Sequence, residues 1–182
     1  MPRIKKFSIF TIGHSTRTLE DFLAVLKHYG ITQVIDIRSI PKSRHNPQFT
    51  NTTLAPFLRN HRIGYRHEKL LGGLRHTHAD SINTAWENAS FRGFADYMQT
   101  GAFQEGLTKL IVIAQKKTVA LMCAEAVPWR CHRSLIADAL LARGIPVIDI
   151  ISMTSAKPHT LTPWAVVEGN TLTYPGPAKR PS

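Results

Sequence analysis

Short, mainly apolar runs alternate along the chain with longer segments in which apolar residues recur at helical spacing. The runs cover residues 7–12, 33–37, 63–67, 118–123 and 146–150. Apolar runs of this length between turn residues are typical of buried strands, whereas spacings of three and four residues indicate one face of a helix. The alternation of the two patterns predicts an α/β fold built on a mostly parallel, open sheet that is flanked by helices.

Local signals give the boundaries of the predicted helices. Thr18 can cap the first helix, with Asp21 three residues later, and Gly30 ends it. Further helices are predicted from Thr52 or Thr53 to about residue 58, from 91 to 98 with Ser90 as the cap, from 103 to 114 and from 131 to 143. Residues 71–89 have the composition of a loop. The helix between the first two strands predicts that these strands pair in parallel through a right-handed crossover.

The C-terminal part carries a hairpin signal. Two strand-like segments, at about 165–168 and 171–174, flank the dipeptide Gly169-Asn170, which suits a two-residue turn. We therefore expect one α/β domain over residues 1–175, with a small β-hairpin at about 165–174, and a flexible tail over 176–182.

Composition narrows the class of protein. Hydrophobic residues make up 43% of the 182 residues, which excludes global disorder. No apolar run approaches the roughly 18 residues of a membrane span, and the N-terminal segment lacks the features of a signal peptide. The two cysteines, Cys123 and Cys131, fit a reducing compartment. We expect a cytoplasmic protein that makes no membrane contact.

The charge favours an anionic partner. The formal net charge is +11, from 23 Lys and Arg against 12 Asp and Glu, which suits an anionic small molecule or a nucleic acid. The basic residues are scattered along the chain, however, so a solvated basic surface explains the charge equally well. The sequence indicates neither a cofactor nor an oligomeric state.

Segments rich in His, Arg, Glu and Cys follow the predicted strands. They lie at residues 13–15, 36–44, 67–75 and 123–133. Because ligands of open parallel sheets bind beyond the carboxyl ends of the strands, we expect these segments to form one site.

The same segments resemble a known family. The matching motifs are Thr11-Ile-Gly-His-Ser15, Asp36-Ile-Arg38, Pro41-Lys-Ser-Arg44, Leu71-Gly-Gly73, Phe91-Arg-Gly-Phe-Ala-Asp-Tyr-Met98, Cys123-Ala-Glu125 and Cys131-His-Arg133. In number and order they resemble the family catalogued as domain of unknown function 488. That family has no settled activity, so the resemblance implies a fold and a set of motifs, and the chemistry must be argued from the residues.

The segment around the cysteines offers a nucleophile. Cys131 is predicted near the start of a helix, beside His132 and Arg133. Free backbone donors and positive charge at such a position lower the pKa of a thiol, although simple packing of Cys131 is the alternative. For Cys123 we favour a buried structural role, because the nearby Glu125 would oppose a thiolate.

Three further residues complete the predicted catalytic set of His14, Asp36, Glu125 and Cys131. His14 can act as a general acid or base or hold a phosphate, or its segment can simply turn the chain. The two carboxylates can transfer protons. Their structural alternatives are an ion pair of Glu125 with Arg133 and one of Asp36 with Arg38 or Arg133.

Six residues are candidates for holding the anion. Arginine can grip a phosphate through two parallel donors, and glycine-rich turns allow close approach of the backbone. The predicted set is Ser15, Arg38, Arg44, Arg75, His132 and Arg133. Ser15 has the alternative of bonding local backbone.

Three functions remain open from the sequence. The first is an enzyme acting on a phosphate-bearing substrate, such as a nucleotide or nucleic acid, with acid–base residues and an arginine-rich anion site. The second is a noncatalytic nucleic-acid-binding module, whose affinity would fall steeply with salt. The third is a metal or redox sensor built on Cys123 and Cys131, with Glu125, His132 and His14 as acceptable further ligands.

Overall fold

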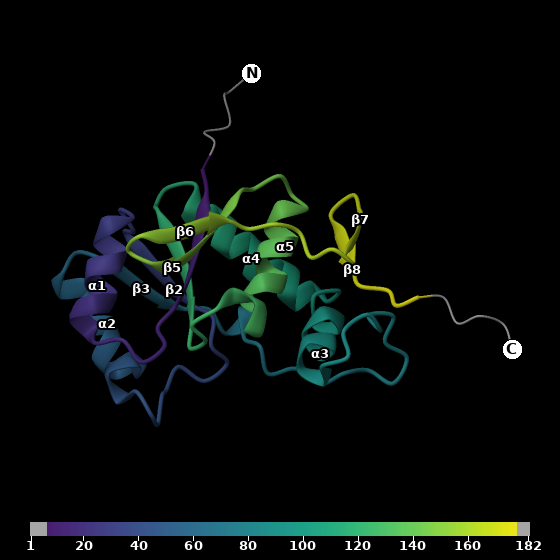
Figure 1. Ribbon diagram of the computed structural model, residues 1–182, viewed down its shortest axis with the longest axis horizontal. Coiled ribbons are helices and arrows are strands. Elements are labelled where there is room, and N and C mark those ends of the chain that lie inside the picture. The colour runs from purple at the N-terminus through teal and green to yellow at the C-terminus, as the bar shows by residue number, and fades with distance from the viewer. Residues whose placement is uncertain (1–6, 178–182) are drawn as a thin grey trace, which may run out of the picture.

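A six-stranded sheet forms the centre of the computed structural model, which describes residues 7–177 (Figure 1). Its strands are β1 (Ile9–Gly13), β2 (Gln33–Asp36), β3 (Gly64–His67), β4 (Val119–Cys123), β5 (Val147–Ser152) and β6 (Ser155–Pro158). They lie in the order β3-β2-β4-β1-β5-β6. The first five strands are parallel, and β6 runs antiparallel to β5 at the edge. The end of β4 therefore lies between the carboxyl ends of β2 and β1.

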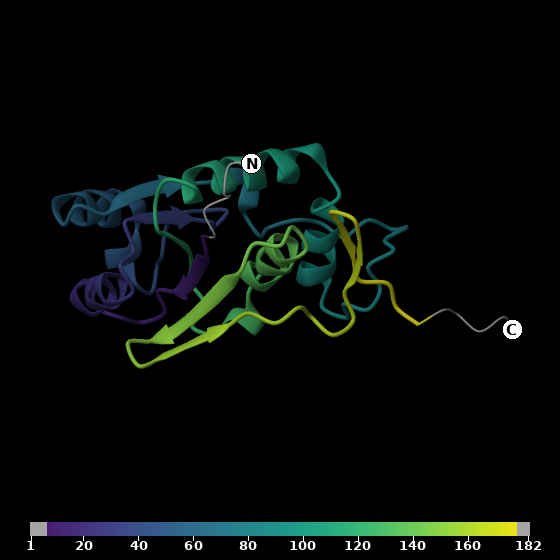
Figure 2. The same cartoon turned by 90° about the horizontal axis from the view of Figure 1, so that it is seen from above.

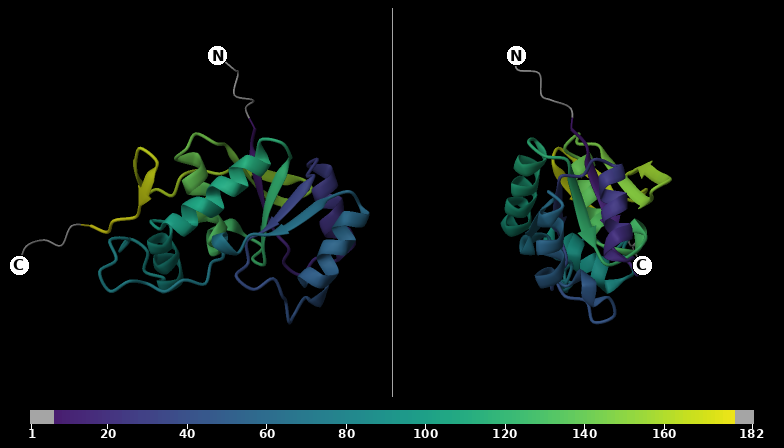
Figure 3. Two further views of the ribbon diagram at one scale, coloured as in Figure 1. Left: turned by 180° about the vertical axis from the view of Figure 1, so that it is seen from behind. Right: turned by 90° about the vertical axis from the view of Figure 1, so that its left-hand side faces the viewer.

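Helices cover both faces of this sheet. Within residues 7–177 they are α1 (Leu19–His28), α2 (Asn51–Asn60), α3 (Ala89–Tyr97), α4 (Gly101–Ala114) and α5 (Arg133–Leu141), with short 3-10 turns η1 (Pro47–Phe49), η2 (Lys69–Leu71) and η3 (Pro128–Arg130). α1 and α2 pack on one face through side chains such as Phe22 and Leu54. α4 and α5 pack on the other through Leu107 and Ile136. Figures 2 and 3 show the sheet between these two layers.

The apolar pattern of β4 determines the face of the sheet toward which its last side chain, Cys123, points. Val119, Leu121 and Cys123 face the layer of α4 and α5, whereas Ala120 and Met122 face the layer of α1 and α2. A strand that is covered on both faces needs apolar residues at every position, which explains the uninterrupted apolar run. The alternation directs the Cys123 side chain toward the α5 layer.

The fold class predicted from the sequence is confirmed. The sheet is mostly parallel, helices flank it, and a separate hairpin of β7 (Val166–Glu168) and β8 (Thr171–Thr173) turns at the predicted dipeptide. Gly169 in this turn has a φ of 62°, which glycine adopts without strain. Thr18 caps α1, because its side chain accepts a hydrogen bond from the backbone N–H of Asp21.

Several boundaries and one pairing differ from the prediction. β1 and β2 are parallel but not paired, since β4 inserts between them. Asn88, not Ser90, caps α3, because the Asn88 side chain accepts from the N–H groups of Ser90 and Phe91. α5 begins at Arg133 rather than at residue 131, because η3 occupies the preceding segment. The short edge strand β6 was not predicted.

The predicted tail at 176–182 lies mostly outside the described residues, which end at 177. Just before it, Leu172 and Tyr174 are buried against the same core as α4 and α5, and Gln99 donates to the Leu172 carbonyl at 2.7 Å. The hairpin is thereby packed onto the second helical layer. Among residues 7–177, no helix combines the length and the apolar character that crossing a membrane requires.

Candidate functional site

A cleft of about 520 Å³ opens at the carboxyl ends of β2 and β4. Segments distant in sequence form it: residues 38–42 after β2, 73–74 after η2, 88–91 at the start of α3, and 123–132 between β4 and α5. This is where open parallel sheets bind their ligands.

Two cysteine side chains meet at the floor of the cleft. Cys123 is the last residue of β4 and Cys131 directly follows η3, and their Sγ atoms are 2.7 Å apart. Both are free thiols, and both are buried. The connection from β4 to α5 thus carries one thiol at each end, and η3 folds it back so that the two touch.

Arg133 contacts both sulfur atoms. Its Nη1 donates to Cys123 Sγ at 2.8 Å, and its backbone N–H donates to Cys131 Sγ at 3.5 Å. The side chain is completely buried and also donates to the carbonyl oxygens of Glu125 and Ala126. In the part of the chain that the structure describes, no carboxylate pairs with it. A buried guanidinium requires a negative partner, and the Cys123 thiolate is in position to supply that charge.

The pKa values of the two thiols move in opposite directions. Burial by itself would raise the pKa of Cys123, but the hydrogen bond from Cys131 and the positive charge of Arg133 lower it to about 7. The hydrogen bond to Cys123, together with burial, raises the pKa of Cys131. The positive charge that the sequence places beside Cys131 thus acts chiefly on Cys123, because the Arg133 side chain reaches back to the end of β4.

His132 lies on the other side of Cys131. Its Nε2–H is shared between the carbonyl oxygens of Ile37 and Leu71, each at 3.0 Å. This leaves Nδ1 as an acceptor at 3.6 Å from Cys131 Sγ. Burial lowers the pKa of His132 to about 4, so the ring is neutral at neutral pH. The ring fits in this place because Gly73 has no Cβ, which would overlap with it.

The end of β1 fixes the loop that carries the cysteines. The backbone N–H groups of His14 and Ser15 donate to carbonyl oxygens at the end of β4, at 2.9 and 3.0 Å. Gly13 comes so close to this loop that a Cβ there would overlap with the carbonyl oxygen of Glu125. The Gly-His-Ser motif therefore has a backbone role, and Ser15 takes a φ of 49° to turn the chain away.

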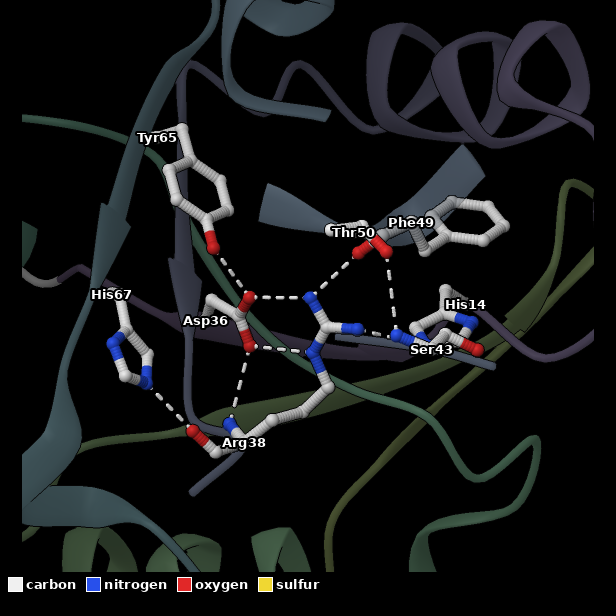
Figure 4. A network of polar contacts seen from close by, with 8 residues as sticks. All are labelled: His14, Asp36, Arg38, Ser43, Phe49, Thr50, Tyr65 and His67. Atoms are coloured by element: carbon white, nitrogen blue, oxygen red, sulfur yellow. Dashed lines mark hydrogen bonds and ion pairs between the residues drawn. The ribbon is translucent and has the colours of Figure 1, made fainter. Parts of the chain in front are cut away.

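A second polar network lies beside the cleft (Figure 4). Asp36, the last residue of β2, accepts from Arg38 Nε at 2.9 Å and from Arg38 Nη2 at 2.6 Å. The Tyr65 hydroxyl donates to the same carboxylate at 2.5 Å, and Arg38 also donates to the Phe49 carbonyl at 2.8 Å. Asp36 and Arg38 are buried. The arginine is thus held rigidly while it contributes to the cleft wall.

His14 reaches the site through Arg38. Its Nδ1–H donates to the Ser15 carbonyl at 2.8 Å, so Nε2 is an acceptor that faces Arg38 Nη1 at 3.4 Å. The ring stacks on Phe49 with centroids 4.3 Å apart. Burial lowers the pKa of His14 to about 4, so a neutral ring orients the guanidinium.

Three other residues predicted from the sequence, Glu125, Arg44 and Arg75, do not contact the two thiols through their side chains. Glu125 is exposed on the cleft wall, and its backbone carbonyl, not its carboxylate, accepts from Arg133. Arg44 is exposed and does not line the cleft. Arg75 lies over the Tyr97 ring, with Cζ 3.6 Å from the centroid. The cleft therefore brings together Arg38, Glu125, Cys131 and His132, with Arg133 beneath it.

Two contacts of this site have no local sign in the sequence. The structural role predicted for Cys123 takes no account of Arg133, whose side chain reaches Cys123 Sγ because the loop folds back. Tyr65 was not singled out, because a tyrosine in a predicted strand carries no sign of its partner. No group of three or more metal-ligating side chains converges within residues 7–177.

Fold and site together define an α/β protein with a pair of thiols at the carboxyl end of an inner strand of a parallel sheet. The chain belongs to the family described as Domain of unknown function DUF488, whose model matches residues 18–140. The resemblance drawn from the motifs is confirmed, and the matched range includes both cysteines and Arg133. No curated protein and no solved structure matches the chain.

Proposed function

We propose that this protein is an enzyme that uses the Cys123 thiolate as a nucleophile on a small, phosphate-bearing or otherwise anionic substrate. One observation carries the proposal: at the floor of the cleft, the buried Arg133 donates to Cys123 Sγ at 2.8 Å, with no carboxylate paired to it among the described residues. A thiolate held in this way is a nucleophile at neutral pH.

The walls of the cleft support an anionic substrate. Arg38, Lys42 and Arg130 line it and supply positive charge, while Leu74 and Phe91 supply apolar surface. A molecule that combines an anionic group with an apolar or aromatic part fits this division. The phosphate of a nucleotide, or of a nucleic-acid end, meets that description. We also propose a cytoplasmic location, where reducing conditions keep Cys123 free.

Competitive alkylation tests this proposal. Iodoacetate is anionic and iodoacetamide is neutral, so the ratio of their rates at a given thiol reports the local charge. We expect Cys123 to be labelled first, with a rate that rises through about pH 7. We expect the ratio to favour iodoacetate by roughly tenfold relative to a free cysteine. Peptide mapping by mass spectrometry assigns the label to its residue.

Two arginine variants control for net charge. Arg130→Ala removes a cation from the cleft lining and should reduce the iodoacetate rate several-fold with little effect on iodoacetamide. Arg59→Ala removes an exposed arginine from the end of α2 and should change neither rate. The proposal fails if the anionic reagent has no advantage at Cys123, or if Cys131 is labelled first.

A further inference from the structure

The contact between the two thiols exceeds what a single nucleophile requires. An enzyme that attacks phosphorus or carbon through sulfur needs one thiolate, yet a second sulfur lies 2.7 Å from Cys123 Sγ. A disulfide bond is about 2.05 Å long, so a small movement of the two side chains would join them. Both thiols are free, and Arg133 contacts each of them.

We propose that Cys123 and Cys131 act as a dithiol that reduces a small anionic disulfide, so that the atom attacked in the substrate is sulfur. The inference rests on the proposed function for its nucleophile and for its basic cleft. It adds the substrate class and a role for the second thiol.

In the first step, the Cys123 thiolate attacks one sulfur of the substrate disulfide. A bond forms between Cys123 Sγ and that sulfur, the sulfur–sulfur bond of the substrate breaks, and the other half leaves as a thiolate. Lys42 and Arg130 on the cleft wall lower the energy of this leaving anion.

In the second step, Cys131 releases the bound half. Once Cys123 is in the mixed disulfide, the negative charge that raised the pKa of Cys131 is gone, and the Cys131 proton passes to the thiolate released in the first step. The Cys131 thiolate attacks Cys123 Sγ, the disulfide between the two cysteines forms, and the second half of the substrate leaves as a thiolate. The backbone N–H of Arg133, 3.5 Å from Cys131 Sγ, stabilises the charge that develops there.

The two steps balance in electrons and atoms. The protein dithiol loses two electrons and becomes a disulfide, while the substrate disulfide gains two electrons and becomes two thiols. A low-molecular-weight thiol, acting as the reductant, returns the protein to its dithiol form by the reverse exchange.

Burial limits the substrate to small molecules. Cys123 is 2% exposed and Cys131 is 6% exposed at the floor of the cleft, so a disulfide within a folded protein has no access to them. The cations that line the cleft favour substrate halves that carry phosphate or carboxylate groups.

The aromatic disulfide 5,5′-dithiobis(2-nitrobenzoate), which is small and anionic, serves as the probe. Reduced wild-type protein should release two equivalents of the coloured aryl thiolate and end as an intact mass two hydrogens lighter. Cys131→Ser should release one equivalent and retain the second aryl thiol as a stable adduct on Cys123. Cys123→Ser should react at least roughly tenfold more slowly, because the thiol that remains is buried and accepts no hydrogen bond from the Arg133 guanidinium.

Distinct outcomes overturn the inference. It fails if wild-type protein retains one or two aryl adducts and forms no internal disulfide, or if the Cys131→Ser adduct is released as fast as in wild type. Circular dichroism of each variant, compared with wild type, shows that the folds are equal. If a variant does not fold, the intact mass of wild-type protein is sufficient, because it distinguishes the internal disulfide from aryl adducts.

Failure of the inference and failure of the proposed function can be told apart. Rapid, anion-selective alkylation of Cys123 without disulfide formation would remove the inference and keep the proposed function. Disulfide formation without any preference for anionic reagents would remove the proposed function and the anionic charge of the proposed substrate, and would keep only the dithiol role of Cys123 and Cys131.

Discussion

At the scale of single residues, the charge of Arg133 controls the chemistry at the end of β4. Its guanidinium is fully buried and meets a sulfur atom and two carbonyl oxygens, whereas its Nε has no acceptor among the described residues. A cation in such surroundings is stabilised most by a full negative charge nearby. Thiolate formation at Cys123 and burial of Arg133 therefore support each other.

Replacing Arg133 with methionine tests this coupling. Methionine keeps much of the side-chain volume but removes the charge and the donors, so the pKa of Cys123 should rise from about 7 toward the ordinary value of about 8.5. The free energy of unfolding should fall by about 3 kcal/mol. The pH dependence of alkylation and urea denaturation measure the two effects.

The exposed arginine of α2 provides the matched control for that substitution. Arg59→Met should change the free energy of unfolding by less than about 0.5 kcal/mol and leave the pH dependence of Cys123 labelling as it is. An unchanged pH midpoint in Arg133→Met would show that Arg133 does not stabilise the thiolate.

At the scale of elements, the end of β1 and the loop between β4 and α5 form one unit. Parallel pairing aligns Gly13 with Cys123, and two backbone hydrogen bonds continue this pairing beyond the strands. The absence of a side chain at Gly13 lets the loop cross at close range. The position of the thiols thus depends on a contact between elements more than a hundred residues apart.

Gly13→Ala should disrupt this unit. A Cβ at position 13 would overlap with the backbone of Glu125, and a backbone obstacle cannot rotate away. We expect the free energy of unfolding to fall by about 3 kcal/mol, as measured by urea denaturation. Gly101→Ala at the start of α4 is the control, because a Cβ there meets nothing within 4 Å. It should be neutral or stabilise by up to about 1 kcal/mol, and equal effects of the two changes would contradict this account.

At the scale of the whole molecule, a buried cluster joins the sheet, α5 and the C-terminal hairpin. His159 contacts Asp149 of β5 at 2.8 Å and Asp138 of α5 at 2.9 Å. Tyr174, just after β8, donates its hydroxyl to Asp138 at 2.7 Å. Burial would lower the pKa of His159, but the hydrogen bonds to the two carboxylates outweigh it and raise the pKa to about 9. The charged imidazole therefore holds three parts of the chain together.

This cluster predicts a pH-dependent stability. Because the pKa of His159 is higher in the folded state, its contribution is complete below the unfolded value of about 6.5 and is lost as the pH rises through about 9. Wild type should exceed His159→Gln in free energy of unfolding by about 2 kcal/mol at pH 6, discounted for partial solvation of the ring. The gap should close toward pH 10 in urea titrations.

Comparing the two proteins at each pH removes other ionisations from this measurement. The lowered pKa of Cys123 acts in the opposite sense, since it adds stability as the pH rises from about 7, but it is present in both proteins. His28→Gln, an exposed change in α1, is the control because it removes a histidine that lies outside this cluster. If the difference in free energy of unfolding between wild type and His159→Gln does not change with pH, His159 is not charged in the folded protein.

The elements of this fold could be predicted because their signals are local. The apolar run of β4, the cap at Thr18 and the turn at Gly169-Asn170 each follow from a few neighbouring residues. The insertion of β4 between β1 and β2 could not be predicted in this way, since strand order depends on which apolar faces meet across long stretches of chain. The edge strand β6 has no clear apolar pattern in the sequence, because it is short and half exposed.

The sequence by itself determined the alternation of strands and helices and the polar segments that follow the strands, because periodicity and turn chemistry are properties of short stretches. Only the tertiary structure decided that Arg133 donates to Cys123, that Asp36 holds Arg38, and that the two cysteine sulfur atoms touch. The pKa of a thiol depends on burial and on charges brought near it by folding, and no spacing along the chain encodes these quantities.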